Sequence, residues 1–150
     1  MSIFEDFEEI MDYAHFWNWV PDWNVAKEVY GKVPESYSIL TPFAYTYLEE
    51  LIRTTTSDYG IPPFDREGQP NKVRVGMSLI ALAIEENKDN IEYIKTLENI
   101  KKHFKYMDIS SDQNGRNRVM HGHIHPRFWS KESFELLIHE IADLSKYSRF

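Results

Sequence analysis

Residues 73–104, VRVGMSLIALAIEENKDNIEYIKTLENIKKHF, decide the fold class. Apolar residues recur every three or four positions in both halves of this stretch, which is the period of a helix with one buried face. They are Val73, Met77, Ile80 and Ile84 in the first half, and Tyr93, Leu97, Ile100 and Phe104 in the second. Asp89, followed three residues later by Glu92, is typical of a capping box at the start of the second half. We therefore predict two consecutive helices, the first ending near Asn87.

The same spacing recurs on both sides of this stretch. Three more helices are expected, at 3–16, at about 41–56 and from Ser130 onwards. Their inward residues are Phe4, Phe7, Met11 and Ala14, then Ala44, Tyr47, Leu48 and Leu51, then Phe134, Leu137, Ile138 and Ile141. Thr41-Pro42 is typical of an N-cap followed by the first helical residue, and Ser130 is a second N-cap. The sequence thus predicts an all-α, antiparallel bundle of about five helices.

The remaining segments give no helical pattern. Residues 24–40 are expected to be irregular because Gly31 and Pro34 interrupt them, and residues 58–71 form a loop with three prolines and two glycines. An aromatic stretch, FWNWVPDW, occupies residues 16–23. We expect its three tryptophans to pack in the core or in a dimer interface rather than to stack on nucleic-acid bases.

Length and composition set the limits of the interpretation. The chain has 150 residues, 42% of them hydrophobic and 27% charged, as in one ordinary globular domain. We expect a single domain over 1–150, with residues 1–37 as an N-terminal extension of a core bundle at 38–150. The longest apolar run, 79–84, is too short to span a membrane, and neither a signal peptide nor a cysteine is present, so a cytoplasmic location is expected.

Charge is unevenly distributed along the chain. The net charge of −7 argues against a general nucleic-acid binder. Residues 1–26 carry six acids and no Lys or Arg, whereas residues 113–131 carry three arginines, one lysine, three histidines and no acid. Such a local basic segment suggests a focused anion site, although a solvated loop is an equally good interpretation of the charges alone.

That basic segment contains the side chains that phosphodiester chemistry needs. It reads Arg116-Asn117-Arg118-Val119-Met120-His121-Gly122. Histidine exchanges protons near neutral pH, and arginine holds phosphate oxygens while staying charged. On a helix, Asn117 and His121 would share one face. The alternative is a purely structural role, with His121 in an interface and Arg116 and Asn117 capping a helix.

The motif and its all-α context resemble the HEPN superfamily, whose R-x4-6-H motif commonly takes the form R-N-x-x-x-H-G. The resemblance covers most of residues 38–147, and residues 1–37 match nothing in the family. It implies a metal-independent endoribonuclease without a cofactor, in a toxin–antitoxin or phage-defence role. The implied partners are RNA, a second copy that completes a composite active site, and a cognate antitoxin or other neighbouring protein. Some members of the family are inactive scaffolds.

The resemblance also implies roles for individual residues. His121 would be the general base or acid for attack by the RNA 2′-hydroxyl, giving 2′,3′-cyclic phosphate ends, and Arg116 would stabilise charge on the phosphoryl oxygens. Asn117 would orient the imidazole or bind phosphate. Contacts to the substrate are expected from the surrounding basic side chains, Arg118, His123, His125 and Arg127.

Other sites and functions remain as alternatives. The H-x-H-x-H pattern of residues 121–125 could bind a transition metal, but no nearby carboxylate completes the set, so no metal is expected. The isolated His15, His103 and His139 are expected to pack rather than to catalyse. The alternative function is a non-catalytic helical binding or scaffold module. The acidic segment at 3–16 is ordinarily a solvated face; it could instead offset the basic surface of a partner or the basic motif of a second copy.

Overall fold

Helices make up the framework of the part of the chain that the structure describes. The computed structural model describes residues 2–104 and 129–150. The α-helices in these ranges are α1 (Ile3–Tyr13), α2 (Val20–Lys32), α3 (Tyr37–Arg53), α4 (Gly76–Glu86), α5 (Ile91–Ile100) and α7 (Lys131–Ser145). Two short 3-10 turns, η1 (Pro34–Ser36) and η2 (Lys101–His103), precede α3 and follow α5. Apart from one isolated β-bridge between Phe64 and Pro70, these ranges contain no β-structure, which confirms the all-α prediction.

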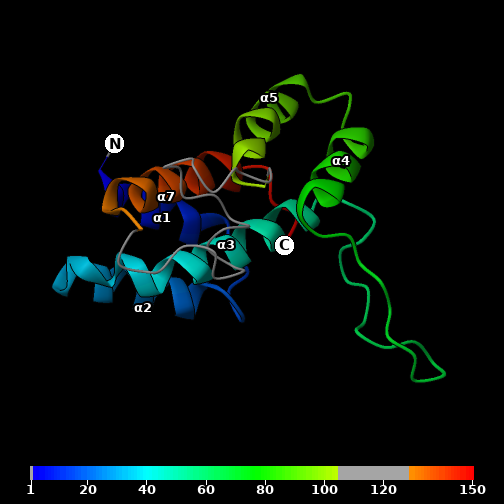
Figure 1. Cartoon of the computed structure of the whole chain (residues 1–150), viewed down its shortest axis with the longest axis horizontal. Helices are drawn as coiled ribbons and strands as arrows, with labels where there is room; N and C mark the ends of the chain where they lie inside the picture. The colour runs from blue at the N-terminus through cyan, green and yellow to red at the C-terminus, as the bar shows by residue number, and fades with distance from the viewer. Residues whose placement is uncertain (1, 105–128) are drawn as a thin grey trace.

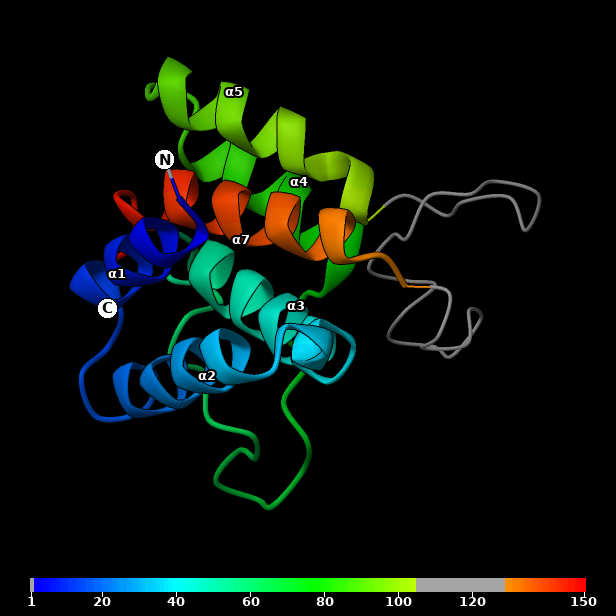
Figure 2. The same ribbon diagram turned by 90° about the vertical axis from the view of Figure 1, so that its left-hand side faces the viewer.

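Helix α7 lies at the centre of the bundle. It packs against α1, α3 and α5, while α4 packs against α3 and α5, and α2 packs against α1 (Figure 1). Helices α2 and α3 run in opposite directions, as do α5 and α7 (Figure 2). The core thus joins helices from both described ranges of the chain.

The sequence pattern of α7 explains its central position. The predicted inward residues Phe134, Leu137, Ile138 and Ile141 are all buried. Ser130 is the N-cap, as predicted, and its Oγ accepts a hydrogen bond from the Ser133 N–H at 3.0 Å. Burying one such aliphatic or aromatic side chain stabilises the fold by about 1.5–3 kcal/mol, so this helix is held mainly by its apolar face.

The two helices predicted within residues 73–104 are confirmed, but their first residues differ from those predicted. Helix α4 begins at Gly76, whose φ of 57° lies in the left-handed region that favours glycine, and the preceding Val73 and Val75 are exposed. Helix α5 is capped by Asn90 rather than Asp89, because the Asn90 side chain accepts from the Tyr93 N–H at 3.1 Å. The predicted inward residues of this second helix, Tyr93, Leu97, Ile100 and Phe104, are all buried.

Helix α2 occupies much of the segment expected to be irregular, so that prediction was wrong. Its Trp23, Ala26 and Tyr30 recur at helical spacing and are buried. Pro21 falls in the first turn, where a missing N–H costs little. Gly31 fits because the Phe4 ring lies against it: a Cβ added there would be 3.3 Å from Phe4 Cε1. Tertiary packing thus outweighs a residue that ordinarily weakens a helix.

The predicted start of α3 at Thr41-Pro42 was also wrong. The helix begins at Tyr37, directly after η1, and Pro42 lies inside it. The Thr41 hydroxyl donates back to the Tyr37 carbonyl at 2.7 Å, and the Thr46 hydroxyl donates to the Pro42 carbonyl at 2.9 Å. The carbonyl that Pro42 leaves without its N–H donor is that of Ser38, four residues earlier, and the helix continues past this gap.

The tryptophans of the aromatic stretch divide into two groups. Helix α1 ends at Tyr13, three residues earlier than predicted, and a turn leads into α2. Trp23 is buried and Trp19 partly buried, and both pack edge-on against Tyr47 with ring centroids 5.0 Å apart. Trp17 is 74% exposed. Core packing is therefore confirmed for Trp19 and Trp23, whereas Trp17 lies outside the core and its packing in a dimer interface stays a prediction.

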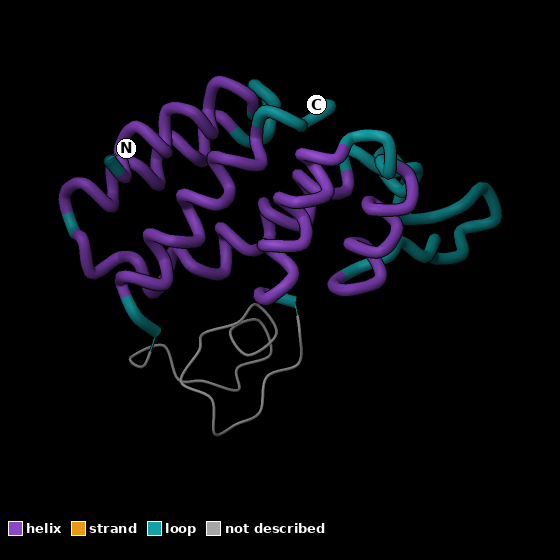
Figure 3. Tube along the Cα trace, turned by 90° about the horizontal axis from the view of Figure 1, so that it is seen from above, coloured by secondary structure: helices purple, strands orange, loops and turns teal. Residues whose placement is uncertain are grey.

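A long arm, residues 57–75, leaves the bundle between α3 and α4. It projects beyond the helices on one side of the molecule (Figures 1 and 3). The arm has its own hydrogen bonds, including Asn71 N–H to the Pro63 carbonyl at 2.9 Å and Asp65 N–H to the Gln69 carbonyl at 2.8 Å. The loop predicted over 58–71 is thus present, and it lies within this arm.

Candidate functional site

The sequence-predicted site lies outside the residues that the structure describes. Arg116, Asn117 and His121, the predicted catalytic residues, all fall within 105–128. The predicted substrate contacts fall in the same range; they are Arg118, His123, His125 and Arg127. Their mutual geometry therefore stays a prediction, and the described residues define what surrounds the two ends of this segment.

Both ends of the segment are anchored in the core. Phe104, the last residue before it, is 1% exposed, and Trp129, the first residue after it, is 8% exposed. The end of η2 and the start of α7 lie at the same end of the bundle (Figure 2). The motif-bearing segment thus leaves and re-enters the described fold at one end, next to a group of buried charges.

That group centres on Glu140 of α7 and is here called the buried ionic cluster; it comprises Tyr45, Asn99, Lys102, His103 and Glu140. Glu140 is 4% exposed. Its Oε2 lies 2.5 Å from His103 Nε2, and its Oε1 accepts from Lys102 Nζ at 2.5 Å. On the other side of the imidazole, His103 Nδ1 lies 3.3 Å from the Tyr45 hydroxyl.

The electrostatics of the buried ionic cluster favour a carboxylate at Glu140. Burial by itself raises the pKa of Glu140, but hydrogen bonds and attraction from His103 and Lys102 outweigh it and bring the pKa below its usual range. Burial, helped by the nearby Glu140, raises the pKa of the Tyr45 hydroxyl, which therefore stays protonated. A carboxylate, an imidazole and a phenol in one line resemble the orienting part of a general-base site.

The geometry, however, assigns the cluster to support rather than to reaction. His103 is 6% exposed, and both ring nitrogens are already engaged, one by Glu140 and one by Tyr45. A general base needs one nitrogen free to reach a proton of the substrate. The prediction that His103 packs rather than catalyses agrees with this arrangement, although its partner was not foreseen. No sequence signal links two residues that are 37 positions apart on different helices.

The other two described histidines also have packing contacts. The His15 ring stacks on Phe16 with centroids 5.3 Å apart. His139 Nδ1 lies 3.2 Å from Asp6 Oδ1, which joins α7 to α1. These contacts agree with the expectation that neither histidine belongs to a catalytic group.

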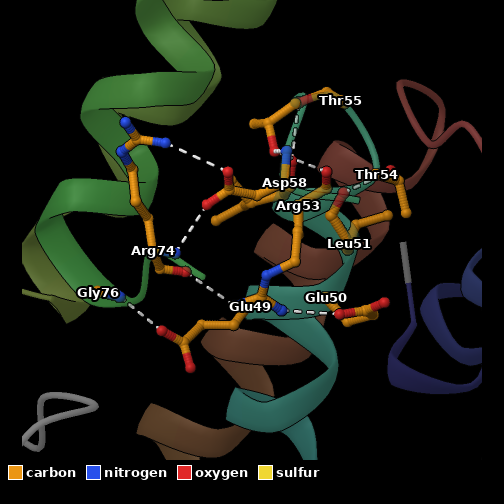
Figure 4. Close-up of polar contacts among 11 residues, drawn as sticks. Glu49, Glu50, Leu51, Arg53, Thr54, Thr55, Asp58, Arg74 and Gly76 are labelled. Carbon is orange, nitrogen blue, oxygen red and sulfur yellow. Dashed lines mark hydrogen bonds and ion pairs between the residues drawn. The ribbon is translucent and has the colours of Figure 1, made fainter. Parts of the chain in front are cut away.

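A second polar network fixes the base of the arm to the bundle (Figure 4). Arg74 donates from its backbone N–H to Asp58 Oδ2 at 2.7 Å and from Nη1 to Asp58 Oδ1 at 3.2 Å. Arg53 donates to the Arg74 carbonyl at 3.1 Å, and Glu49 Oε1 accepts from the Gly76 N–H at 2.6 Å. Each charge has a partner within the chain, which is the pattern of a structural clamp.

The clamp borders an open groove of about 560 Å³. Its walls combine residues of the arm with the end of α3, including Tyr59, Ile61, Pro62, Glu50 and Arg53. Because Glu50 holds the Arg53 guanidinium at 2.7 Å, the groove offers no uncompensated cation to an anionic ligand. We therefore assign it no ligand.

The described residues contain no group of three or more His, Cys, Asp or Glu side chains that could hold a metal ion. The H-x-H-x-H pattern lies in the range that the structure does not describe. In the described ranges, no helix has the length and apolarity needed to cross a bilayer.

Comparisons with known proteins give no further constraint. The chain matches no family model, no curated protein and no solved structure. The functional argument therefore depends on the residues of this chain alone.

Proposed function

We propose that this protein is a metal-independent endoribonuclease that cleaves RNA by attack of the 2′-hydroxyl on the adjacent phosphorus. The observation that carries the proposal is the sequence Arg116-Asn117-Arg118-Val119-Met120-His121-Gly122 in the one basic, histidine-rich segment of an acidic chain. His121 moves the proton, Arg116 neutralises charge on the phosphoryl oxygens, and Asn117 orients the imidazole or binds phosphate. Products carry a 2′,3′-cyclic phosphate and a 5′-hydroxyl.

Two features of the described fold support this proposal. The bundle is all-α, as the resemblance to the HEPN superfamily requires, and the motif-bearing segment is joined to it at two buried residues, Phe104 and Trp129. A segment whose ends are fixed can be held in one geometry at lower entropic cost than a free tail. The proposal includes the partners that the resemblance implies: a second copy facing the first, so that two motifs form one cleft, and a neutralising antitoxin. A toxin or phage-defence role in the cytoplasm belongs to the same proposal.

The proposal is tested by incubating purified protein with a labelled single-stranded RNA in excess EDTA. We expect cleavage that leaves cyclic phosphate ends and no cleavage of the matching DNA, which lacks the 2′-hydroxyl. His121→Ala should reduce the rate by about 10²–10⁴-fold, the usual contribution of a general acid or base. Arg116→Ala should lose a comparable factor.

Matched controls keep this experiment specific. His139→Ala and Arg66→Ala remove one imidazole and one guanidinium from exposed positions elsewhere, so both variants should cleave as the wild type does. If wild type, His121→Ala and Arg116→Ala cut RNA equally well, the activity belongs to another site or to a contaminant, and the proposal is wrong.

A non-catalytic helical binding module is the second candidate, and the net charge of −7 favours it. Such a module would show no cleavage by wild-type protein under any of these conditions. Toxicity on expression that His121→Ala relieves would instead favour the nuclease.

A further inference from the structure

The turn between α1 and α2 presents two aromatic rings to solvent. Phe16 is 68% exposed and Trp17 is 74% exposed, which makes them the two most exposed aromatic side chains in the described part of the chain. Trp23, six residues after Trp17, is 1% exposed, so an aromatic side chain close in sequence does pack in the core. Large adjacent apolar groups in water are typical of an interaction surface.

The two rings are held in place by the fold. Phe16 stacks on His15 with ring planes 24° apart, and it contacts Trp17 at a centroid distance of 5.5 Å. The His15 ring in turn meets Phe150 at 6.2 Å. The His15 carbonyl accepts from the Trp19 and Val20 N–H groups at 3.0 and 3.2 Å, which fixes the backbone of the turn. Rings fixed in this way lose little conformational entropy on binding, as interface hot spots require.

The surroundings of the rings are acidic. Glu9 and Asp12 of α1 and Asp22 of α2 flank the turn, and none of them has an ion-pair partner among the described residues. Residues 1–26 contain no Lys or Arg, and Lys27, the next base, is occupied by Glu8. A hollow of about 350 Å³ along α1 is lined by Glu5, Glu8, Glu9, Asp12 and Tyr13, so the acids share a surface with the exposed Tyr13 ring, which ends α1 three residues before Phe16.

We propose that this surface, formed by Glu9, Asp12, Tyr13, Phe16 and Trp17 and here called the acidic–aromatic face, binds a basic segment of a partner protein. Apolar side chains of that segment would cover Phe16 and Trp17, while its Lys or Arg side chains would meet the unpaired carboxylates. A single-stranded nucleic acid could stack on the rings, but its phosphates would be repelled by the carboxylates of Glu9, Asp12 and Asp22. Charge complementarity therefore selects a cationic polypeptide.

The acidic–aromatic face lies far from the described residues that flank the proposed nuclease segment. In Figure 2 the α1–α2 turn lies at the opposite end of the bundle from the end of η2 and the start of α7. The proposed partner site is therefore independent of the proposed function. Peptide binding tests it, and RNA cleavage does not enter that measurement.

Binding is tested by fluorescence anisotropy with a labelled amphipathic Lys/Leu peptide of about four helical turns. The comparison probes are the same peptide with Glu in place of Lys, and a labelled single-stranded oligouridine. We expect the Lys/Leu peptide to bind and the other two not to. Trp17→Ala and the double variant Glu9→Lys/Asp12→Lys should each weaken its Kd by about tenfold or more, since interface hot spots carry at least that share of affinity.

Two control variants carry the same chemical changes elsewhere. Phe64→Ala removes a 58% exposed ring from the arm, and Glu85→Lys/Asp89→Lys reverses two exposed acids around α4; both should leave the Kd within about twofold of wild type. Circular dichroism verifies that each variant keeps its helices, and the two site variants test the proposal independently. Equal weakening by control and site variants, failure of the Lys/Leu peptide to bind, or tighter binding of oligouridine would overturn the proposal.

Discussion

The two ends of the bundle differ in which side chains they bury: one buries charged side chains, and the other exposes apolar ones. At one end, where η2 stops, His103 is almost completely buried and pairs with the buried Glu140, which belongs to the second half of α7. At the other end, the apolar Phe16 and Trp17 lie in water although a core is within reach. The first arrangement holds helices together, whereas the second leaves most of the surface of both rings without a contact in the described fold. A buried charged pair therefore marks the end that holds helices together, and exposed apolar rings mark the end that we propose for binding.

Removing the charge at the structural end should have the largest effect. Glu140→Ala leaves His103 and Lys102 without their carboxylate, and breaking a buried pair in this way costs about 3–5 kcal/mol. Urea denaturation followed by circular dichroism measures the loss in free energy of unfolding. The control Glu132→Ala, on the exposed first turn of the same helix, should stay within about 0.5 kcal/mol of wild type. A small effect of Glu140→Ala would mean that the cluster is solvated in solution.

A comparison of two tryptophans tests the contrast between the ends most directly. Trp23→Ala removes a ring packed against Phe7, Phe43 and Tyr47 and should cost about 3–5 kcal/mol. Trp17→Ala removes a ring of the same size from solvent and should change the free energy of unfolding by no more than about 0.5 kcal/mol. The same urea titration measures both. Similar losses for the two variants would contradict the exposed position of Trp17.

The structural end should also respond to acid. The pKa of Glu140 is lowered in the folded protein from an ordinary value of 4.5, so the folded state binds fewer protons than the unfolded state in that range. The stabilisation is present above pH 4.5 and is lost as the pH falls through the folded-state pKa. Urea midpoints measured from about pH 7 to pH 3 should therefore fall more steeply for wild type than for Glu140→Gln.

A matched variant separates this effect from general acid denaturation. Glu132→Gln removes an exposed carboxylate from the same helix and should keep the steepness of the wild-type curve. Parallel curves for wild type and Glu140→Gln would show that another carboxylate controls acid stability.

A smaller loss of stability than for Glu140→Ala is expected where the buried ionic cluster meets α3. Tyr45→Phe removes only the hydroxyl that lies 3.3 Å from His103 Nδ1, and one such hydrogen bond contributes about 0.5–1.5 kcal/mol. The loss should be additive with Trp23→Ala and non-additive with Glu140→Ala, because only the latter shares a network with it. A double-mutant cycle in urea gives this coupling. Full additivity with Glu140→Ala would show that the phenol does not belong to the cluster.

Local signals were sufficient for most of the helices. Apolar period identified α4, α5 and α7, the predicted N-cap Ser130 begins α7, and the inward residues predicted for α5 and α7 are buried. They failed where a helix continues through a residue that ordinarily interrupts one: Gly31 lies in α2 against the Phe4 ring, and Pro42 lies inside α3. How strongly a glycine or proline disfavours a helix depends on contacts with residues that are distant in sequence. The sequence pattern therefore overestimated this effect.

The sequence by itself determined the all-α class and the buried faces of α5 and α7, because helical period and capping are local properties of the chain. It also supplied the whole of the proposed catalytic motif, Arg116 to His121, as a cluster of suitable side chains. Only the tertiary structure decided that His103 pairs with Glu140 and that Trp17 is exposed while Trp23 is buried. Periodicity predicts that a residue faces inward but not which residues it contacts, because those contacts depend on how whole helices pack.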